Sequence, residues 1–486
     1  MVQCIAINRR IDVEKENQMQ KRYGLWTAIG MVVGIVIGSG VFFKAQNVLY
    51  SNDGNMFASL MTVLLVGLIM LVCSYCFSLL AARVEKVNGL VDYSEMALGK
   101  FYAYSVGWFI TTIFYPTLTS CLAWISASYT LVLFGVSNAH WGITLVLASL
   151  YLLASFTLNV ISPEISGKFQ VSTTFIKLVP LVIMAIIGTI VGIFKGTFVD
   201  NAAVGSLGVM GDSSGGFFGA VVAFAFAFEG WIFATCINSE LKDAKKNLPR
   251  ALFFGAIVII TVYLGYFIGI FSVLDVAHIM ASDNLPKDAF TALFGSPIFG
   301  TVAYVFVVVS CLGTMNGLLL ACCRGIYSVA ARDEGPAPKF FAHVNKRFNM
   351  PIRSAVFGLA TVLFWLLQWQ IGFINGYLPR FLSFEHDELP IITFYASCIP
   401  IFIYIMKDCK DLGIIKRFII PSIASVASAF MVFAAIYKYR LDTLYYLAVF
   451  TVIMICGLLF YRVEGKTVAA KITDKIKNIL ITKEEK

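Results

Sequence analysis

Apolar stretches of about 20 residues recur along the whole chain, and this recurrence constrains the fold more than any other feature. Each stretch can cross a bilayer as a helix, because a helix advances about 1.5 Å per residue and the hydrocarbon core is about 30 Å thick. The sequence therefore predicts an all-α polytopic membrane protein. Its twelve predicted spans start near Leu25, Phe57, Phe101, Trp141, Val171, Gly216, Ala251, Ala289, Ser354, Leu389, Phe418 and Thr443.

The composition excludes the other broad classes. Apolar residues make up 59% of the chain and charged residues 13%, against roughly 45–50% and 25% in soluble domains. The net charge of +9 could suggest a nucleic-acid binder, but the charges lie between the apolar runs. The eleven cysteines fall mostly in apolar spans, without the ligand spacing of a metal site. We predict the lipid bilayer as a partner, and no nucleic acid, metal or cofactor.

The basic residues set the predicted orientation. With the N-terminus, the even-numbered connections and the C-terminus on one side, that side carries 30 of the 37 Lys and Arg residues, and the other side carries six. Positive charge accumulates in cytoplasmic loops. We therefore expect a multi-pass protein of the cytoplasmic membrane with both termini in the cytoplasm.

Two spans contain residues that favour an interruption of the helix at mid-span. The first span carries Gly38, Ser39 and Gly40, and the sixth carries Glu229 followed by Gly230. Unwound backbone at membrane depth is tolerated only where it lines a cavity or is buried in protein. A substrate site at both breaks is the functional interpretation.

Each break also has a purely structural interpretation. Gly30, Gly34 and Gly38 recur every four residues, as in the small-residue stripes that let helices pack closely. Such a stripe explains Gly30 and Gly34 but not Gly40. Glu229 could be an acid satisfied by local hydroxyl or backbone groups. A carboxylate at this depth costs a few kcal/mol, so we favour a functional role.

Interrupted helices at equivalent places in two halves are typical of inverted-repeat transporters with a site at the midplane. Free N–H groups at the start of a half-helix suit a carboxylate, and the unpaired carbonyls before the break suit an ammonium. Together they fit the zwitterionic head of an α-amino acid. The predicted layout is a cytoplasmic segment (1–24), a first repeat of five helices (25–195), a second repeat of five (216–406), two peripheral helices (416–463) and a basic cytoplasmic tail (464–486).

Three motifs in order carry a family resemblance. They are Gly38 to Phe42, then Phe226 to Trp231 with Glu240 and Asn247 to Arg250, then Asn316-Gly317 with Arg324 and Ala331 to Pro338. From about Gly24 to Ile405 the chain resembles the amino acid, polyamine and organocation superfamily, and within it the L-amino acid transporter branch with its bacterial serine/threonine exchanger relatives. The resemblance implies a five-plus-five inverted-repeat fold that works by alternating access.

The resemblance also implies roles for individual residues. Backbone N–H groups of Ser39, Gly40 and Val41, next to Gly38, would bind the substrate carboxylate. Carbonyls of Val36, Ile37, Phe226, Ala227, Phe228 and Glu229 would bind its amino group. Phe226 matches the aromatic residue that closes over the substrate from outside, and Glu240 matches an acid at the inner gate.

Lys177 is charged yet falls about seven residues, or 10 Å, inside the fifth predicted span. It could snorkel to the headgroups. By the resemblance, its ammonium stands where sodium-coupled relatives hold a sodium ion, close to Gly34 and the hydroxyl of Ser310. We favour this coupling role, in which the lysine is either a fixed charge or a proton carrier.

Three further features qualify the resemblance. Glu229 stands where the vertebrate members have glycine, so their substrates should not be transferred. The connection from Gly135 to His140 lacks the cysteine that bonds an ancillary subunit in those members, so we expect no disulfide-linked partner. The acidic segment from Glu385 to Pro390 is predicted to be a solvated external loop, with an outer-gate role as the alternative.

The sequence thus predicts a sodium-independent carrier of L-α-amino acids, neutral ones in the first place, that works by exchange or with protons. The carrier alternative is a proton-coupled importer of cationic amino acids or polyamines, with Glu229 offsetting the extra positive charge. A receptor that does not transport is a more distant alternative. An enzyme is not expected, because all four histidines fall in or near connections.

Overall fold

The computed structural model describes residues 21–38, 40–84, 88–136, 140–205, 216–463, 466–471 and 473. Most of the predicted terminal segments 1–24 and 464–486 therefore lies outside the described residues, as does Ser39. The membrane-crossing segments are α2 (Leu25–Val36) with α3 (Gly40–Ser51), α4 (Met56–Ala81), α5 (Gly89–Phe109) with η1 (Ile110–Phe114) and α6 (Tyr115–Leu133), α7 (Trp141–Ile161), α8 (Pro163–Ile183) with η2 (Met184–Gly188) and α9 (Thr189–Lys195), α11 (Gly216–Phe228) with η4 (Trp231–Glu240), α12 (Ala244–Val273), α15 (Pro297–Ala330), α17 (Ile352–Leu367) with η5 (Gln368–Ile374), α18 (Pro390–Asp408), η7 (Ile415–Ile419) with α19 (Ile420–Tyr439), and α20 (Leu441–Leu458).

Shorter elements lie in the connections. They are α10 (Thr197–Val204), α13 (Val276–Ala281), α14 (Leu285–Phe294), α16 (Pro338–Phe341), η6 (Arg380–Leu382) and the antiparallel pair β1 (Arg462–Val463) and β2 (Lys466–Thr467).

Within the described part of the chain, eleven helices are long and apolar enough to cross a membrane. The predicted first span is not among them, because it is divided into α2 and α3, of 12 residues each. Large apolar side chains such as those of Phe175 and Val426 are 70% exposed on α8 and α19, as expected where lipid replaces water. The all-helical membrane class is therefore confirmed, whereas the division into two repeats stays a prediction.

Four predicted starts are wrong. The third and seventh spans begin at Gly89 and Ala244 rather than near Phe101 and Ala251. The eighth crossing helix begins at Pro297 rather than near Ala289, because Gly295, at φ +69°, ends α14 before Pro297 begins α15. The fifth begins at Pro163 rather than Val171, where the Ser162 hydroxyl accepts a hydrogen bond from the N–H of Ile165. Lys177 therefore lies deeper in its helix than predicted.

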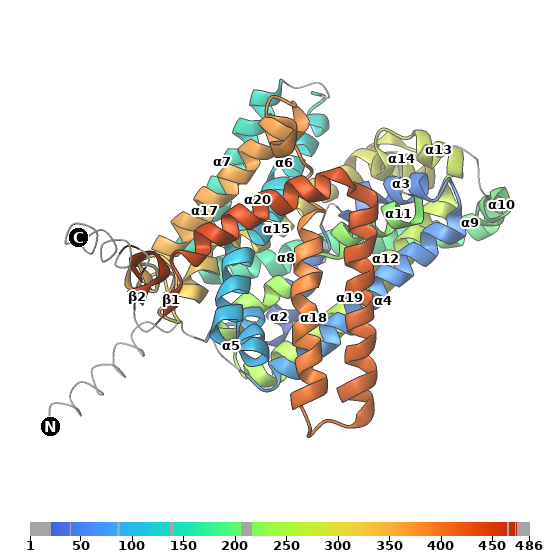
Figure 1. The fold of residues 1–486 in the computed structure, drawn as a ribbon. Helices are drawn as coiled ribbons and strands as arrows, with labels where there is room; N and C mark the ends of the chain where they lie inside the picture. Colours follow the sequence, from blue (N-terminus) through green and yellow to red (C-terminus); the bar gives the residue numbers. More distant parts are fainter. Residues whose placement is uncertain are drawn as a thin grey trace, which may run out of the picture.

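The two interrupted spans lie inside the bundle. The first half-helix, α2, packs against α8, α12 and α15, and the second, α3, packs against α11. In Figure 1, α13 and α14 lie beside α3 at one end of the bundle, while α19 and α20 run along its outside. The breaks in the first and sixth spans are thus enclosed by protein rather than by lipid, as unwound backbone requires.

Candidate functional site

The first break separates α2 from α3. Helix α2 ends at Val36, Ile37 turns to an extended conformation with φ −72° and ψ 90°, and α3 begins at Gly40. A Cβ on Gly40 would lie 2.6 Å from the Cα of Ala227, so only glycine lets the two broken spans approach this closely. Ser39, predicted to bind the substrate carboxylate, lies outside the described residues.

The second break follows α11. That helix ends at Phe228, and Gly230 has a φ of +106°, which L-residues with a side chain rarely adopt. The chain then continues as the 3-10 segment η4. Glycine is therefore what allows the sixth span to unwind beside Glu229.

A tyrosine of α12, missed in the sequence analysis, joins the two breaks. The Tyr263 hydroxyl lies 3.1 Å from the carbonyl oxygen of Val36 and 2.9 Å from that of Ala227. These are two of the carbonyls predicted to bind the substrate amino group. A buried tyrosine in an apolar span needs a hydrogen-bond partner, and that requirement was the available sequence signal.

Lys177 reaches the first break from α8. Its Nζ donates to the carbonyl oxygen of Gly34 at 2.6 Å and to Oγ1 of Thr314 at 3.0 Å, and the side chain is fully buried. The snorkelling alternative is therefore wrong. Among the described residues, no carboxylate lies within ion-pair distance of this ammonium.

The hydroxyl beside Lys177 is that of Thr314, not of Ser310 as predicted. Thr314 Oγ1 also donates to the carbonyls of Gly34 and Ile37, at 3.1 Å each. Ser310 lies one helical turn earlier on α15, and its hydroxyl is 3.4 Å from the carbonyls of Ile37 and Gly38. The predicted register was off by this one turn.

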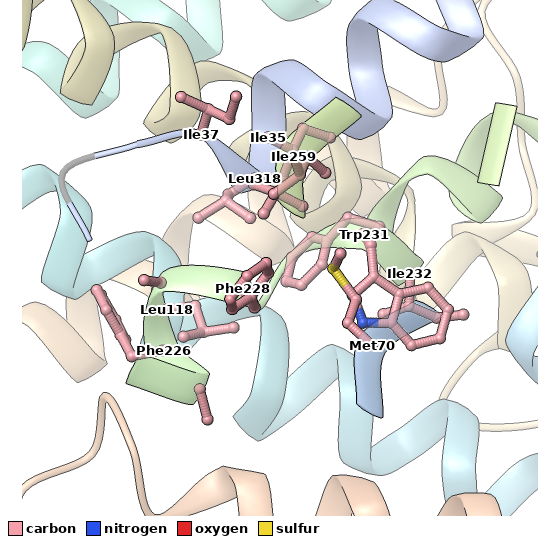
Figure 2. Close-up of a cluster of buried hydrophobic side chains, with 14 of the residues drawn as sticks. Ile35, Ile37, Met70, Leu118, Phe226, Phe228, Trp231, Ile232, Ile259 and Leu318 are labelled. Carbon is pink, nitrogen blue, oxygen red and sulfur yellow. The ribbon is translucent and has the colours of Figure 1, made fainter. Parts of the chain in front are cut away.

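A cavity of about 20 Å³ lies between the two breaks. That volume accommodates roughly one water molecule, so the site is closed around its centre. Figure 2 shows the apolar side chains that crowd it, among them Phe226, Leu118 and Leu318. Its lining consists of Ile35, Val36, Gly38, Gly40, Leu118, Leu122, Phe226, Glu229, Gly230, Thr314 and Leu318. The other predicted site residues Ile37, Val41, Ala227 and Phe228 are buried and do not line it.

Glu229 contributes the carboxylate of this cavity. Its side chain is buried, and among the described residues the only donor that interacts with its carboxylate is the backbone N–H of Gly230. A buried charge without a basic partner is costly. The carboxylate is thus available to a ligand that can donate hydrogen bonds.

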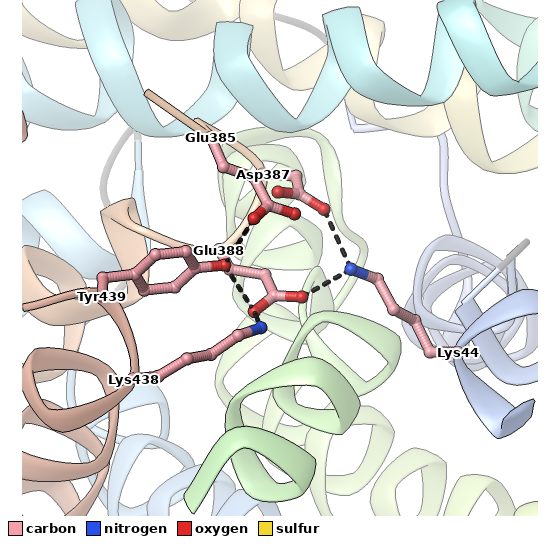
Figure 3. Close-up of polar contacts among 6 residues, drawn as sticks. All are labelled: Lys44, Glu385, Asp387, Glu388, Lys438 and Tyr439. Atoms are coloured by element: carbon pink, nitrogen blue, oxygen red, sulfur yellow. Dashed lines mark hydrogen bonds and ion pairs between the residues drawn. The ribbon is translucent and has the colours of Figure 1, made fainter. Parts of the chain in front are cut away.

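An ion-pair cluster closes the site on the side of α3 (Figure 3). Lys44 Nζ lies 2.5 Å from Glu388 Oε1, 3.2 Å from Asp387 Oδ2 and 5.0 Å from the centre of the Phe226 ring. Lys438 Nζ of α19 lies 2.5 Å from the other oxygen of Glu388. Glu388 thereby links the outer half of the first span to the eleventh, and we name this set with Glu385 and Tyr439 the outer cluster.

The prediction of a solvated loop at Glu385 to Pro390 is therefore wrong. His386, Asp387 and Glu388 are buried, because Lys44 and Lys438 neutralise carboxylates that would otherwise need water. The Tyr439 hydroxyl also lies 3.0 Å from Glu385 Oε2 and 2.8 Å from Glu388 Oε2, within hydrogen-bond distance of both. The two lysines come from spans far apart in the chain.

The loop groups of the outer cluster differ in their pKa values. Burial raises the pKa of Glu388, but Lys438 and Lys44 outweigh burial and hold it at about 2. Burial, reinforced by the charges of Asp387 and Glu388, raises the pKa of Glu385 to about 8. Burial lowers the pKa of His386 to about 3. Glu388 is therefore ionised near neutral pH, whereas Glu385 carries a proton.

The opposite side is closed by backbone pairing and a buried ion pair. The N–H groups of Arg22 and Tyr23 donate to the carbonyl of Glu240 at 2.7 and 3.1 Å, and the N–H of Lys242 donates to that of Tyr23 at 2.8 Å. Glu240 Oε1 lies 2.7 Å from Nη2 of Arg324, and both side chains are buried. The gating role predicted for Glu240 stays a prediction, and we name this set the inner closure.

Comparison with known proteins identifies the family. Residues 23–463 match the family model described as amino acid permease. The serine/threonine exchanger SteT of Bacillus subtilis (strain 168) is 30% identical over 356 residues, which are 73% of this chain and 78% of SteT. The human large neutral amino acids transporter small subunit 2 is 28% identical over 379 residues, or 74% of this chain and 67% of that protein. The human b(0,+)-type amino acid transporter 1 is 27% identical over 454 residues, or 92% and 88%.

A solved structure shows the same fold. The crystal structure of MhsT in complex with L-phenylalanine aligns with a TM-score of 0.56 at 14% identity, and the match covers 89% of this chain and 99% of that one. The family resemblance predicted from three motifs is thereby confirmed. The chain belongs to the amino acid permease family of the amino acid, polyamine and organocation superfamily.

Proposed function

We propose that this permease carries neutral L-α-amino acids across the cytoplasmic membrane without sodium, by exchange or coupled to protons, with both termini in the cytoplasm. The observation that carries the proposal is the Lys177 ammonium at the first break, on the Gly34 carbonyl and the Thr314 hydroxyl. In transporters with broken helices, such freed oxygens coordinate the coupling sodium ion. An ammonium at this place supplies that charge from the protein itself.

The broken helices supply the two ends of an amino acid site. The first N–H groups of α3 face the break with the positive end of the helix dipole, which suits a carboxylate. The carbonyls of Val36 and Ala227 both lie within reach of the Tyr263 hydroxyl, whose single proton goes to one of them at a time, so each carbonyl keeps lone-pair capacity for a substrate donor. The names of the relatives, a serine/threonine exchanger and a large neutral amino acids transporter, support this class of substrate and support exchange.

The two closures support alternating access. The outer cluster and the inner closure are both formed, and the cavity between them is too small for an amino acid. A substrate can therefore enter only if one closure opens. We propose that the two open in turn, by movement of a repeat of residues 25–195 against one of residues 216–406.

The test is uptake of labelled L-amino acids into vesicles of purified protein in sodium-free buffer, with empty or preloaded lumens and with or without an inward proton gradient. We expect uptake of neutral amino acids without sodium. Stimulation by preloading alone would establish exchange, and stimulation by external acid would establish proton coupling. Uptake that requires sodium would overturn the proposal.

Glu229 favours a second candidate, a carrier of cationic amino acids or polyamines. Its buried carboxylate lines the cavity without a basic partner among the described residues, and it could pair with a second ammonium on the substrate. The same vesicles distinguish the two candidates when lysine and putrescine are compared with serine. If E229Q abolished lysine uptake and spared serine uptake, the second candidate would replace the first as the physiological activity.

A further inference from the structure

A positively charged hollow of about 830 Å³ lies beside the inner closure. Among the described residues that line it, the basic ones are Lys21, Arg22, Lys168 and Lys242, and the acidic one is Glu164. Glu164 Oε1 lies 3.0 Å from Lys168 Nζ, so much of its charge is offset. The volume falls in the range of small-molecule sites, and the excess of positive charge selects an anion.

The hollow opens at the edge of the lipid-facing surface. Trp26, next to the lining residue Thr27, is 80% exposed. On α8, Ile165 and Phe169 flank Lys168 and are also exposed. Exposed tryptophan is typical of the membrane interface, and apolar side chains that continue along a helix from that level face acyl chains. The anion that meets this surface therefore carries a hydrocarbon portion.

We propose that the hollow binds the phosphate headgroup of an anionic phospholipid, with its acyl chains against Trp26 and Phe169. Basic pockets between membrane helices on the cytoplasmic side bind such headgroups. The lysines donate to the phosphate oxygens as charge-assisted hydrogen bonds.

The position of the hollow gives the lipid a role in gating. Its charged residues come from the segment before α2, from α8 and from the turn after η4, and backbone pairing at residues 22–23 and 240–242 holds two of these together. If the inner closure opened, these segments would separate and the hollow would lose its shape. A bound anionic lipid consequently stabilises the inwardly closed state, because it binds that state better.

The test measures binding without relying on transport. The thermal unfolding midpoint of the purified full-length protein is recorded in neutral detergent with added phosphatidylglycerol, phosphatidylcholine or inorganic phosphate. We expect phosphatidylglycerol to raise the midpoint by several degrees, and phosphatidylcholine and phosphate to have little effect. In the double variant Lys168→Gln/Lys242→Gln the rise should fall by at least half.

The double variant Lys410→Gln/Lys416→Gln serves as the matched control, because it removes two charges from an exposed connection between α18 and α19. It should keep the full effect of phosphatidylglycerol. An equal loss in both double variants would mean nonspecific attraction and would overturn the proposal. Full stabilisation by inorganic phosphate would show a free-phosphate site instead and would also overturn it. Because no substrate is used, either result leaves the proposed transport function untouched.

Discussion

Lys177 joins α8 to α2 and α15 through hydrogen bonds from one buried ammonium. Hydrogen bonds to charged groups contribute about 1.5–3 kcal/mol each. A methionine at this position fills a similar volume but donates nothing, so Lys177→Met separates the charge from the packing. We expect sodium-free uptake to fall by roughly tenfold or more, since about 1.4 kcal/mol corresponds to a factor of ten.

The uptake is normalised to folded protein, measured by fluorescence-detected gel filtration. Lys195→Met is the control, because Lys195 is exposed at the end of α9, and it should transport like the wild type. If Lys177→Met kept wild-type uptake, the ammonium would have no coupling role. If added sodium restored uptake by Lys177→Met, a sodium ion would be occupying the place that the ammonium fills in the wild type.

At the scale of helices, the closest approach of the two broken spans depends on Gly40. A methyl group there would meet the backbone of Ala227 at 2.6 Å, which cannot yield as a flexible side chain can. Overpacking of this kind costs about 1–3 kcal/mol. Gly40→Ala should therefore lower the thermal unfolding midpoint and slow uptake.

The control for this variant is Gly413→Ala, because nothing lies within 4 Å of a Cβ at Gly413. Its unfolding midpoint should match that of the wild type. Were both alanine variants equally stable, the half-helices would not pack as closely as described.

The inner closure depends on the ion pair between η4 and α15. Removing one partner of a buried pair leaves an uncompensated charge and costs about 3–5 kcal/mol. In Glu240→Gln that cost falls on the closed arrangement, because Arg324 regains water when the closure opens. Maleimide labelling of the buried Cys236 and Cys323, located by peptide mass spectrometry, should become several-fold faster.

The exposed pair of Arg83 and Asp411 provides the matched control, with 2.7 Å between Nη2 and Oδ2. Surface pairs contribute little, so Asp411→Asn should label at the wild-type rate. Unchanged labelling in Glu240→Gln would argue against a gating role for Glu240.

At the scale of the whole molecule, the sequence predicted the features that lipid itself imposes. Every backbone group in the bilayer core must be satisfied, so long apolar runs must be helices and breaks must fall inside the bundle. The interruptions at Gly38 to Gly40 and at Glu229–Gly230 are found where the sequence predicts them. Hydropathy did not place the helix ends at Pro163 and Pro297, because capping and turn residues decide them.

The partners that cross between spans could not be predicted in the same way. The hydroxyls of Tyr263 and Thr314 lie within hydrogen-bond distance of carbonyl oxygens of α2. Which polar residue of a helix faces the break depends on the rotation of that helix about its own axis, and hydropathy does not specify this rotation. Glu388 was assigned to a solvated loop because its partners Lys44 and Lys438 lie in other spans. Whether a charged residue in a connection is buried can be judged only when the positions of its counter-ions are known.

The outer cluster makes opening of the whole transporter sensitive to pH. Glu385 faces Lys44 of α3, Asp387 and Glu388 of its own loop, and Lys438 and Tyr439 of α19. Its pKa of about 8 in the closed state returns toward the ordinary value of about 4.3 when the cluster opens to water. Between these values closing takes up a proton. Stabilisation of the closed state is therefore complete below the ordinary pKa and is lost as pH rises through about 8.

In the closed state neither Glu388 nor His386 titrates in this window, because their pKa values are about 2 and about 3, and any titration of these two groups on opening is common to both proteins compared below. The readout is maleimide labelling of Cys121, which is buried in α6. The rate in the wild type divided by that in Glu385→Gln cancels the intrinsic pH dependence of the thiol. This ratio should be near one at pH 6 and should rise several-fold by pH 9, since glutamine mimics the protonated acid.

In Asp442→Asn, which breaks an exposed pair with Arg380, the rate should follow the wild type at every pH. A ratio that stays flat would show that the outer side opens without releasing the proton of Glu385.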